Sequence, residues 1–135
     1  MAKKVLIIGG VAAGMKTASR LRRRDKDAEI MVIERGELVS YGACGFPYYI
    51  SDEVKNFDKF THTPQGIARD VDYFKNVKGI DVLIRHEAKK INRAAKTVTV
   101  LNKETGTAED MPYDVLVLGT GATPACSRGR FERHT

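Results

Sequence analysis

The amino-acid sequence predicts an α/β fold in which a parallel sheet is interrupted by an antiparallel β-meander. Short apolar runs at residues 5–8, 30–33 and 115–118 are typical of strands that are buried on both faces, as in a parallel sheet. A glycine turn and a helical pattern separate the first two runs, which is the order of a β-α-β unit. Around residues 87–112 the pattern alternates, as in antiparallel strands with one exposed face. Together these patterns predict a Rossmann-like sheet with an antiparallel excursion.

The β-α-β unit comes first in the chain. Residues 9–14 read Gly-Gly-Val-Ala-Ala-Gly, and the second apolar run ends at Glu34, twenty residues after the last glycine of the turn. Apolar positions in between recur every three residues, as on one helix face: Met15, Ala18 and Leu21. Strand, glycine turn, helix, strand and acid form the fingerprint of a dinucleotide site. Val11 is one departure, because the G-x-G-x-x-G pattern has its second glycine there.

The small residues of this turn allow a bound pyrophosphate to approach the backbone closely. They are Gly9, Gly10, Ala12, Ala13 and Gly14. A helix that begins at the turn points its free N–H groups at the same phosphates, and the Glu34 carboxylate can accept hydrogen bonds from ribose hydroxyls. We therefore predict dinucleotide binding. The alternative is a β-α-β unit whose glycines serve only close packing.

Length and composition indicate one soluble globular domain. The chain has 135 residues, of which 42% are hydrophobic and 30% charged. It contains no apolar stretch of membrane-span length and no signal-peptide core. Two cysteines without a pairing pattern agree with a reducing compartment. We expect a cytoplasmic protein that binds no membrane, and we expect no metal site.

The net charge of +6 includes a basic face on the first helix. Its members are Lys16, Arg20, Arg23 and Arg24. This face is interpreted either as a solvated surface or as a contact for an anionic group such as a nucleotide phosphate. Nucleic-acid binding is not expected, because the sequence contains no aromatic interleaving and no nucleic-acid-binding motif.

The middle of the chain is expected to be mostly loop over residues 36–62, apart from a short apolar stretch at residues 46–50. Thr63 followed by Pro64 predicts an N-cap and the first position of a helix, and Gly79 predicts its end. The expected buried stripe of this helix is Ile67, Val71 and Phe74.

Three more strands complete the predicted sheets. Residues 81–84 read as a third buried strand, residues 97–101 as a half-exposed strand of the meander, and residues 115–118 as the return to the parallel sheet. Ligands of open α/β sheets bind at the carboxyl ends of the strands. The glycine turn, Glu34 and residues 119–121 are therefore expected to lie at one site.

Residues 40–49 read Ser-Tyr-Gly-Ala-Cys-Gly-Phe-Pro-Tyr-Tyr and form the second informative segment. Gly42 and Gly45 leave the sulfur of Cys44 accessible, and Pro47 suits the first turn of a short helix. A thiol at a helix N-terminus carries more thiolate. We predict a redox or nucleophilic role for Cys44, which would act alone through a mixed disulfide or a sulfenic acid. The alternative is a buried, inert cysteine.

Residues 9–15, 40–49 and 113–124 together resemble the single-cysteine branch of the FAD-dependent pyridine nucleotide-disulfide oxidoreductases. This branch contains coenzyme A-disulfide reductases, NADH-dependent persulfide and polysulfide reductases, and NADH oxidases and peroxidases. The resemblance covers about residues 3–124. It implies a homodimeric enzyme that passes electrons from NADH or NADPH through FAD to a single redox cysteine. The implied substrate is a disulfide, persulfide or polysulfide.

The resemblance also implies a set of FAD-binding residues. They are Gly9, Gly10, Ala12, Ala13, Gly14, Glu34, Arg35, Ala88, Thr120 and Gly121. Within this set the glycine turn would hold the pyrophosphate, Glu34 the adenosine ribose, and the backbone of Ala88 the adenine. Thr120 and Gly121 match a segment that usually reads Ala-Thr-Gly, with Gly119 in the first position. Cys44 matches the redox cysteine beside the flavin.

The substrate within the branch stays open. Arg20, Arg23 and Ser40 resemble residues of coenzyme A-disulfide reductases, where the arginines could meet coenzyme A phosphates. Many of those enzymes have Asn where this chain has Ala43, and the Gly-Ala-Cys-Gly segment is closer to the sulfur-reducing members. The turn at residues 10–13 contains no histidine for peroxide cleavage. An NADH oxidase or flavin reductase in which the cysteine has another role is the alternative.

The resembling enzymes are several hundred residues long. We therefore expect residues 1–124 to be the N-terminal part of an FAD-binding domain, truncated relative to those enzymes. The chain alone is expected to be a catalytically silent nucleotide-binding fragment. Residues 125–135 are polar and arginine-rich, and we expect them to be an atypical tail that is foreign or out of frame. Cys126 in this tail is expected to be inert.

Overall fold

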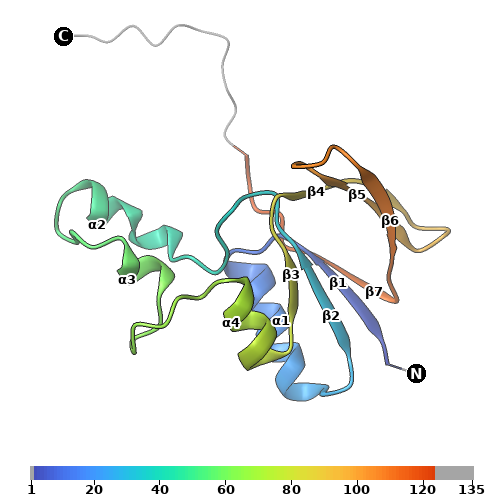
Figure 1. The fold of residues 1–135 in the computed structure, drawn as a ribbon, viewed down its shortest axis with the longest axis horizontal. Coiled ribbons are helices and arrows are strands. Elements are labelled where there is room, and N and C mark those ends of the chain that lie inside the picture. Colours follow the sequence, from blue (N-terminus) through green and yellow to red (C-terminus); the bar gives the residue numbers. More distant parts are fainter. Residues whose placement is uncertain (1, 124–135) are drawn as a thin grey trace, which may run out of the picture.

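The computed structural model describes residues 2–123, which form three layers (Figure 1). The central layer is a parallel sheet, with helices α1 and α4 on one face and an antiparallel sheet on the other. A lobe made of α2 and α3 extends from the helical side. The predicted tail at residues 125–135, with Cys126, lies outside the described residues.

The parallel sheet confirms the predicted fold class. Its strands are β1 Lys4–Ile8, β2 Glu29–Ile33, β3 Asp81–Leu83 and β7 Val115–Leu118, in the order β3-β2-β1-β7. All three pairings are parallel, with Ile8 opposite both Ile33 and Leu118. The carboxyl ends of β1, β2 and β7 therefore lie at one edge of the layer, as the sequence predicts.

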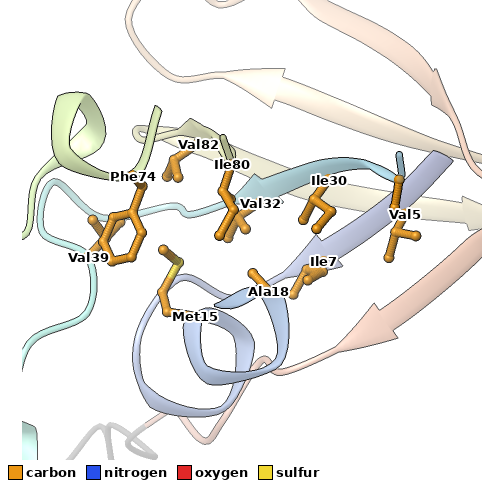
Figure 2. Close-up of a cluster of buried hydrophobic side chains, with 11 residues drawn as sticks. Val5, Ile7, Met15, Ala18, Ile30, Val32, Val39, Phe74, Ile80 and Val82 are labelled. Carbon is orange, nitrogen blue, oxygen red and sulfur yellow. The ribbon is translucent and has the colours of Figure 1, made fainter. Parts of the chain in front are cut away.

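Burial on both faces explains why the central strands are continuously apolar. Val5 and Ile7 of β1 face α1 (Ala12–Arg24) and α4 (Val71–Lys78), in the cluster shown in Figure 2. Leu6, between them, faces the antiparallel sheet and packs with Ile33 and its neighbours there. Each fully buried aliphatic side chain contributes about 1.5–3 kcal/mol.

The predicted meander is confirmed as a three-stranded antiparallel sheet. Its strands are β4 His86–Asn92, β5 Thr97–Asn102 and β6 Ala108–Pro112, and β5 lies in the middle. Val98 and Val100 alternate with exposed or half-buried residues and are fully buried against the parallel sheet. The register of β4 shifts between Ala88 and Lys90, which marks a bulge.

The lobe contains more helix than the sequence predicts. A 3-10 turn, η1 (Ala43–Gly45), leads into α2 (Phe46–Ile50), and Pro47 lies in the first turn of α2, as predicted. The short helix α3 (Asp58–Thr61) falls within the region that is expected to be loop. Phe60 of α3 packs edge-on against the rings of Phe46 and Tyr49, which come from α2, and a local pattern cannot show these contacts.

The helix predicted to begin at Pro64, with Thr63 as its N-cap, begins instead at Val71, so this prediction is wrong. The Asp70 side chain caps α4 by accepting a hydrogen bond from the Tyr73 N–H at 2.8 Å. Residues 62–68 form a turn closed by a bridge between His62 and Ala68, and Ile67 is 54% exposed rather than buried. Gly79 ends α4 in the left-handed conformation, as predicted.

No helix among residues 2–123 has the length and apolar character needed to cross a membrane.

Three glycines bring the backbones of β1, α1 and β7 into direct contact. A Cβ atom on Gly14 would lie 1.8 Å from the Gly9 carbonyl oxygen, and one on Gly9 would lie 2.1 Å from the Gly119 carbonyl oxygen. Gly9 also has a φ of +107°, which side chains disfavour. The Gly119 N–H donates to the Ile8 carbonyl at 2.7 Å and completes the contact.

We expect Gly14→Ala to destabilise the fold by at least about 1–3 kcal/mol, because the added methyl group meets backbone that cannot rotate away. Denaturant unfolding followed by circular dichroism measures this change. The matched control is Gly42→Ala, since a Cβ at Gly42 has no neighbour closer than 3.8 Å and its φ is −84°. Equal stability of the two variants would contradict the role assigned to the Gly14 contact.

Candidate nucleotide site

A cavity of about 640 Å³ lies at the carboxyl ends of β1, β2 and β7. Four segments form its wall: the glycine turn with the start of α1, the end of β2, the start of β4, and the loop after β7. Tyr41 and Ala43 add a fifth side, next to the turn that carries Cys44. This is the site position that the order of strands predicts.

The α1 N-terminus faces this cavity through Ala12 and Ala13. No side chain caps α1, and its first turn contains no acidic residue. Its first N–H groups and the positive end of the helix dipole therefore suit an anionic group. Val11, the departure from the G-x-G-x-x-G pattern, has a φ of −98°, so this position does not need the positive φ that favours glycine.

Glu34 is the one buried charged residue of the described chain, with 9% exposure. Its Oε2 accepts the Gly10 N–H at 2.7 Å, and its Oε1 accepts the Gly36 N–H at 2.8 Å. These two bonds hold the carboxylate at the end of β2, on the cavity wall. Each oxygen retains acceptor capacity that a pair of ligand hydroxyls can use.

The start of β4 forms the wall beyond Glu34. The His86 N–H donates to the Glu34 carbonyl at 2.9 Å, and its ring Nδ1 lies 2.6 Å from the Ile84 carbonyl. Glu87 forms an ion pair with Lys89 at 3.0 Å, and the hydrogen bond from this ammonium lowers the pKa of the Glu87 carboxyl against the opposing effect of burial. Arg35 donates through Nη2 to Thr123 Oγ1 at 3.1 Å.

Most of the predicted cofactor residues come together here. Those that line the cavity are Gly9, Ala12, Ala13, Glu34, Arg35, Ala88, Thr120 and Gly121. Gly10 and Gly14 are not on the wall but support it, since Gly10 binds the Glu34 carboxylate and Gly14 packs on Gly9. Tyr41, Ala43 and His86 also line the cavity and were not predicted as site residues. The position of His86, two residues before the predicted adenine contact Ala88, was the one signal that could have indicated it.

Cys44 is exposed and unpaired among residues 2–123, so it is not the buried cysteine of the alternative interpretation. It lies in η1, and its neighbour Ala43 lines the cavity. Ser40, at a φ of +54°, donates its N–H to the Gly10 carbonyl at 2.8 Å and so ties this segment to the glycine turn.

The predicted substrate residues Arg20 and Arg23 lie apart from this cavity. Both are exposed on α1, as are the other members of the basic helix face. Arg22, between them, has a structural role that the sequence did not indicate. Its guanidinium donates to the carbonyls of Lys26 at 2.6 Å and Gly79 at 2.7 Å, which ties the ends of α1 and α4 together.

A Rossmann-type sheet with a glycine turn and a carboxylate at its carboxyl edge defines a dinucleotide-binding domain. The chain belongs to the pyridine nucleotide-disulphide oxidoreductase family, whose sequence profile matches residues 3–130. The family consists of enzymes, and its cofactors are FAD together with NADH or NADPH.

Individual relatives are consistent with this family. The chain is 39% identical over 121 residues to a coenzyme A disulfide reductase of Staphylococcus haemolyticus, a match that covers 89% of this chain and 26% of the relative. It is 37% identical to an NADH oxidase of Methanocaldococcus jannaschii, covering 90% of this chain and 25% of that protein. The structure of an NAD-dependent persulfide reductase from A. fulgidus superimposes with a TM-score of 0.87 at 46% identity, covering 93% of this chain and 23% of that one. The chain thus spans about a quarter of the length of these relatives.

We expect Glu34→Gln to destabilise the protein by about 1–3 kcal/mol, because the amide NH2 cannot accept one of the two backbone N–H groups that the carboxylate now satisfies. Urea unfolding measures the change. Glu109→Gln is the control, since Glu109 is exposed on β6. Equal midpoints for the two variants would show that these two hydrogen bonds contribute little.

Proposed function

We propose that this chain is the FAD-binding part of an oxidoreductase that uses NADH or NADPH to reduce a disulfide, persulfide or polysulfide at Cys44. The observation that carries the proposal is the cavity in which an uncapped helix N-terminus, a glycine turn and the Glu34 carboxylate meet. These groups match the two polar parts of a dinucleotide, its phosphates and its ribose hydroxyls.

The residues present fit the pyrophosphate of FAD. Gly9 and Gly14 have no space for a side chain, so β1, α1 and the loop after β7 pack backbone to backbone beside the cavity. Ala12 and Ala13 place only methyl groups at its wall and leave the first N–H groups of α1 accessible. Thr120 and Gly121 close the opposite side from the loop after β7.

The adenosine half of FAD would lie toward β2 and β4. The Glu34 carboxylate, held by Gly10 and Gly36, would accept the ribose hydroxyls. Arg35 and the backbone of Ala88 border the same end of the cavity and would contact the adenine side. FAD, when bound, supplies two-electron transfer between a nicotinamide nucleotide and a disulfide.

Cys44 would act as the nucleophile of the substrate half-reaction. Its thiolate attacks a substrate disulfide, forms a mixed disulfide and releases one substrate thiolate. Two electrons, supplied by NADH or NADPH, and one proton then convert the mixed disulfide to the Cys44 thiolate and the second substrate thiol. The exposure of Cys44 permits the approach of a small thiol or sulfur compound.

Two classes of substrate are compatible with an exposed Cys44. A coenzyme A disulfide would use Arg20, Arg23 and Ser40, and the exposed arginines of α1 are available for phosphates. A persulfide or polysulfide needs no such phosphate contact. The relatives include proteins named for coenzyme A disulfide and for persulfide, and also an NADH oxidase, which represents the alternative in which Cys44 has another role.

We propose that the full-length enzyme is a cytoplasmic homodimer, that residues 1–124 are the N-terminal part of its FAD-binding domain, and that this chain alone is catalytically silent. We also propose that residues 125–135 are an atypical tail.

We expect the 135-residue chain to bind FAD and ADP with dissociation constants within about tenfold, or about 1.4 kcal/mol. Every contact proposed above belongs to the ADP portion of FAD, so the flavin ring adds little. Isothermal titration calorimetry with each ligand measures the difference. FAD binding about a hundredfold tighter than ADP, or more, would mean that this chain also forms the flavin pocket.

A chimera tests the role of Cys44. Residues 3–123 replace the matching segment of the A. fulgidus persulfide reductase, and NADH-dependent reduction of disulfide and persulfide substrates is followed. Cys44→Ser should abolish reduction while the bound flavin absorbance stays, because the nucleophile is lost and the cavity is intact. Lys55→Ala, an exposed position of the same lobe, is the control. Full activity of the Cys44→Ser chimera would refute the proposed chemistry.

A further inference from the structure

We propose that Arg69 is a positioning residue for Cys44, because its guanidinium holds the Phe60 carbonyl on which the Cys44 turn is anchored. This inference deepens the proposed function and rests on the assignment of Cys44 as the nucleophile. Arg69 follows Cys44 by 25 residues and belongs to the turn before α4, so no local sequence pattern connects the two.

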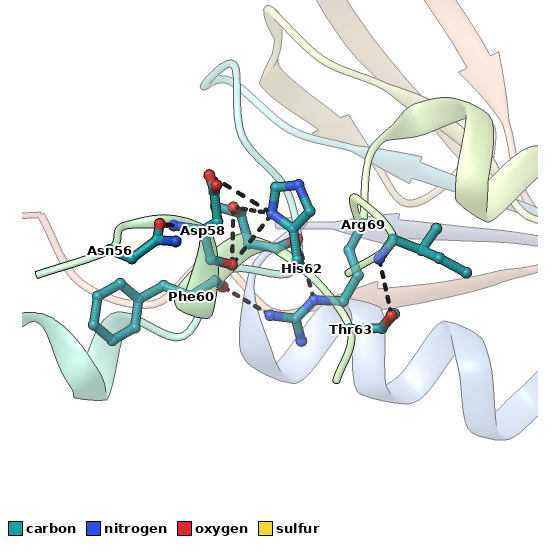
Figure 3. A network of polar contacts seen from close by, with 8 residues as sticks. Asn56, Asp58, Phe60, His62, Thr63 and Arg69 are labelled. Carbon is teal, nitrogen blue, oxygen red and sulfur yellow. Dashed lines mark hydrogen bonds and ion pairs between the residues drawn. The ribbon is translucent and has the colours of Figure 1, made fainter. Parts of the chain in front are cut away.

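The Phe60 carbonyl connects the Cys44 turn to the segment that contains Arg69. It accepts the Gly42 N–H at 2.9 Å and the Arg69 Nη2 at 2.7 Å. Arg69 also donates through Nε to the Thr61 carbonyl at 3.4 Å, and its backbone N–H donates to the same carbonyl at 2.9 Å. Figure 3 shows the guanidinium directed at the end of α3. Hydrogen bonds from a charged donor are stronger than neutral ones, so Arg69 is the stronger of the two donors to the Phe60 carbonyl.

The Phe60 ring supports the other side of the cysteine. A Cβ on Gly45 would lie 2.3 Å from the ring, so the backbone at Gly45 rests directly on it. The Phe60 ring also packs edge-on against the Phe46 ring, with the two ring centroids 5.7 Å apart, and Phe60 is only 8% exposed. Phe60 therefore touches Gly42 with its carbonyl and Gly45 with its ring, on the two sides of Cys44.

The Cys44 turn has few other anchors. Neither η1 nor α2 contains a buried residue, and the Gly45 N–H bonds only within the turn, to the Gly42 carbonyl at 2.9 Å. Within residues 2–123, Arg69 forms no ion pair, so its charge is directed at the two α3 carbonyls. The turn borders the cavity through Ala43, and the position of Phe60 therefore decides where Cys44 lies relative to the cavity.

The test uses the full 135-residue chain with Cys126→Ser, so that Cys44 is the single thiol. Amide hydrogen exchange and backbone relaxation are measured by NMR for Arg69→Ala, for Arg69→Lys, and for Arg93→Ala as an exposed control that removes the same charge. We expect Arg69→Ala to accelerate exchange of the Gly42 amide by about tenfold or more, while the amides of β1 and β2 keep their protection. The Cys44 order parameter should fall from about 0.85 to below about 0.6.

Arg69→Lys should rescue part of the effect, because an ammonium can donate to one of the two carbonyls but lacks the planar fork. If Arg69→Ala does not fold, the Gly42 and Cys44 amides of Arg69→Lys test the proposal instead. Unchanged Gly42 and Cys44 amides in both variants, or loss of protection in β1 and β2 to the same degree, would overturn the proposal. Arg93→Ala should match the parent chain.

A separate assay distinguishes failure of this inference from failure of the proposed function. The parent chain with Cys126→Ser is treated with 2,2′-dithiodipyridine, and release of pyridine thione reports the mixed disulfide at Cys44. Release of one equivalent from the folded chain supports the nucleophile on which the inference rests. An unreactive Cys44 would refute the proposed function and leave Arg69 as a purely structural residue, even if the NMR result is as expected.

Discussion

The backbone contact among Gly9, Gly14 and Gly119 is the constraint on which the rest of the structure depends. It sets the distance between β1, the start of α1 and the loop after β7, and neither Gly9 nor Gly14 has space for a Cβ atom. This close packing places the N-terminus of α1, which no side chain caps, at the carboxyl edge of the sheet. The same close packing thus joins the sheet to α1 and sets the position of the helix N-terminus on the cavity wall.

Glu34 connects this contact to the second strand. Its carboxylate accepts N–H groups from the glycine turn and from the chain beyond β2, so it fixes the relative position of two segments of the cavity wall. Glu34, predicted to bind ribose, therefore has a structural role in the absence of any ligand. This structural role follows from burial, because a buried carboxylate must be satisfied by nearby donors.

The lobe that contains Cys44, made of η1, α2 and α3, is held together mainly by aromatic packing. Aromatic rings from α2, α3 and the intervening chain pack together, and backbone bonds to the Phe60 and Gly10 carbonyls attach the cysteine segment to its surroundings. The lobe therefore shares little of the aliphatic core between sheet and helices. The cavity is thus held by packed strands, whereas Cys44 is held by a small separate lobe.

The sequence by itself determined the strands of both sheets, α1 and the left-handed end of α4 at Gly79, because each depends on a local pattern. It also determined that the glycine turn meets Glu34, because the carboxyl ends of parallel strands lie at one edge of the sheet. Tertiary structure alone decided what depends on partners distant along the chain. Thr63-Pro64 resembles a helix start, yet the Asp70 cap and the bridge between His62 and Ala68 move that start to Val71. Long-range contacts likewise decide the position of α3, the exposure of Ile67 and the link from Arg69 to the Cys44 turn. The spacing of residues within one segment cannot predict such contacts.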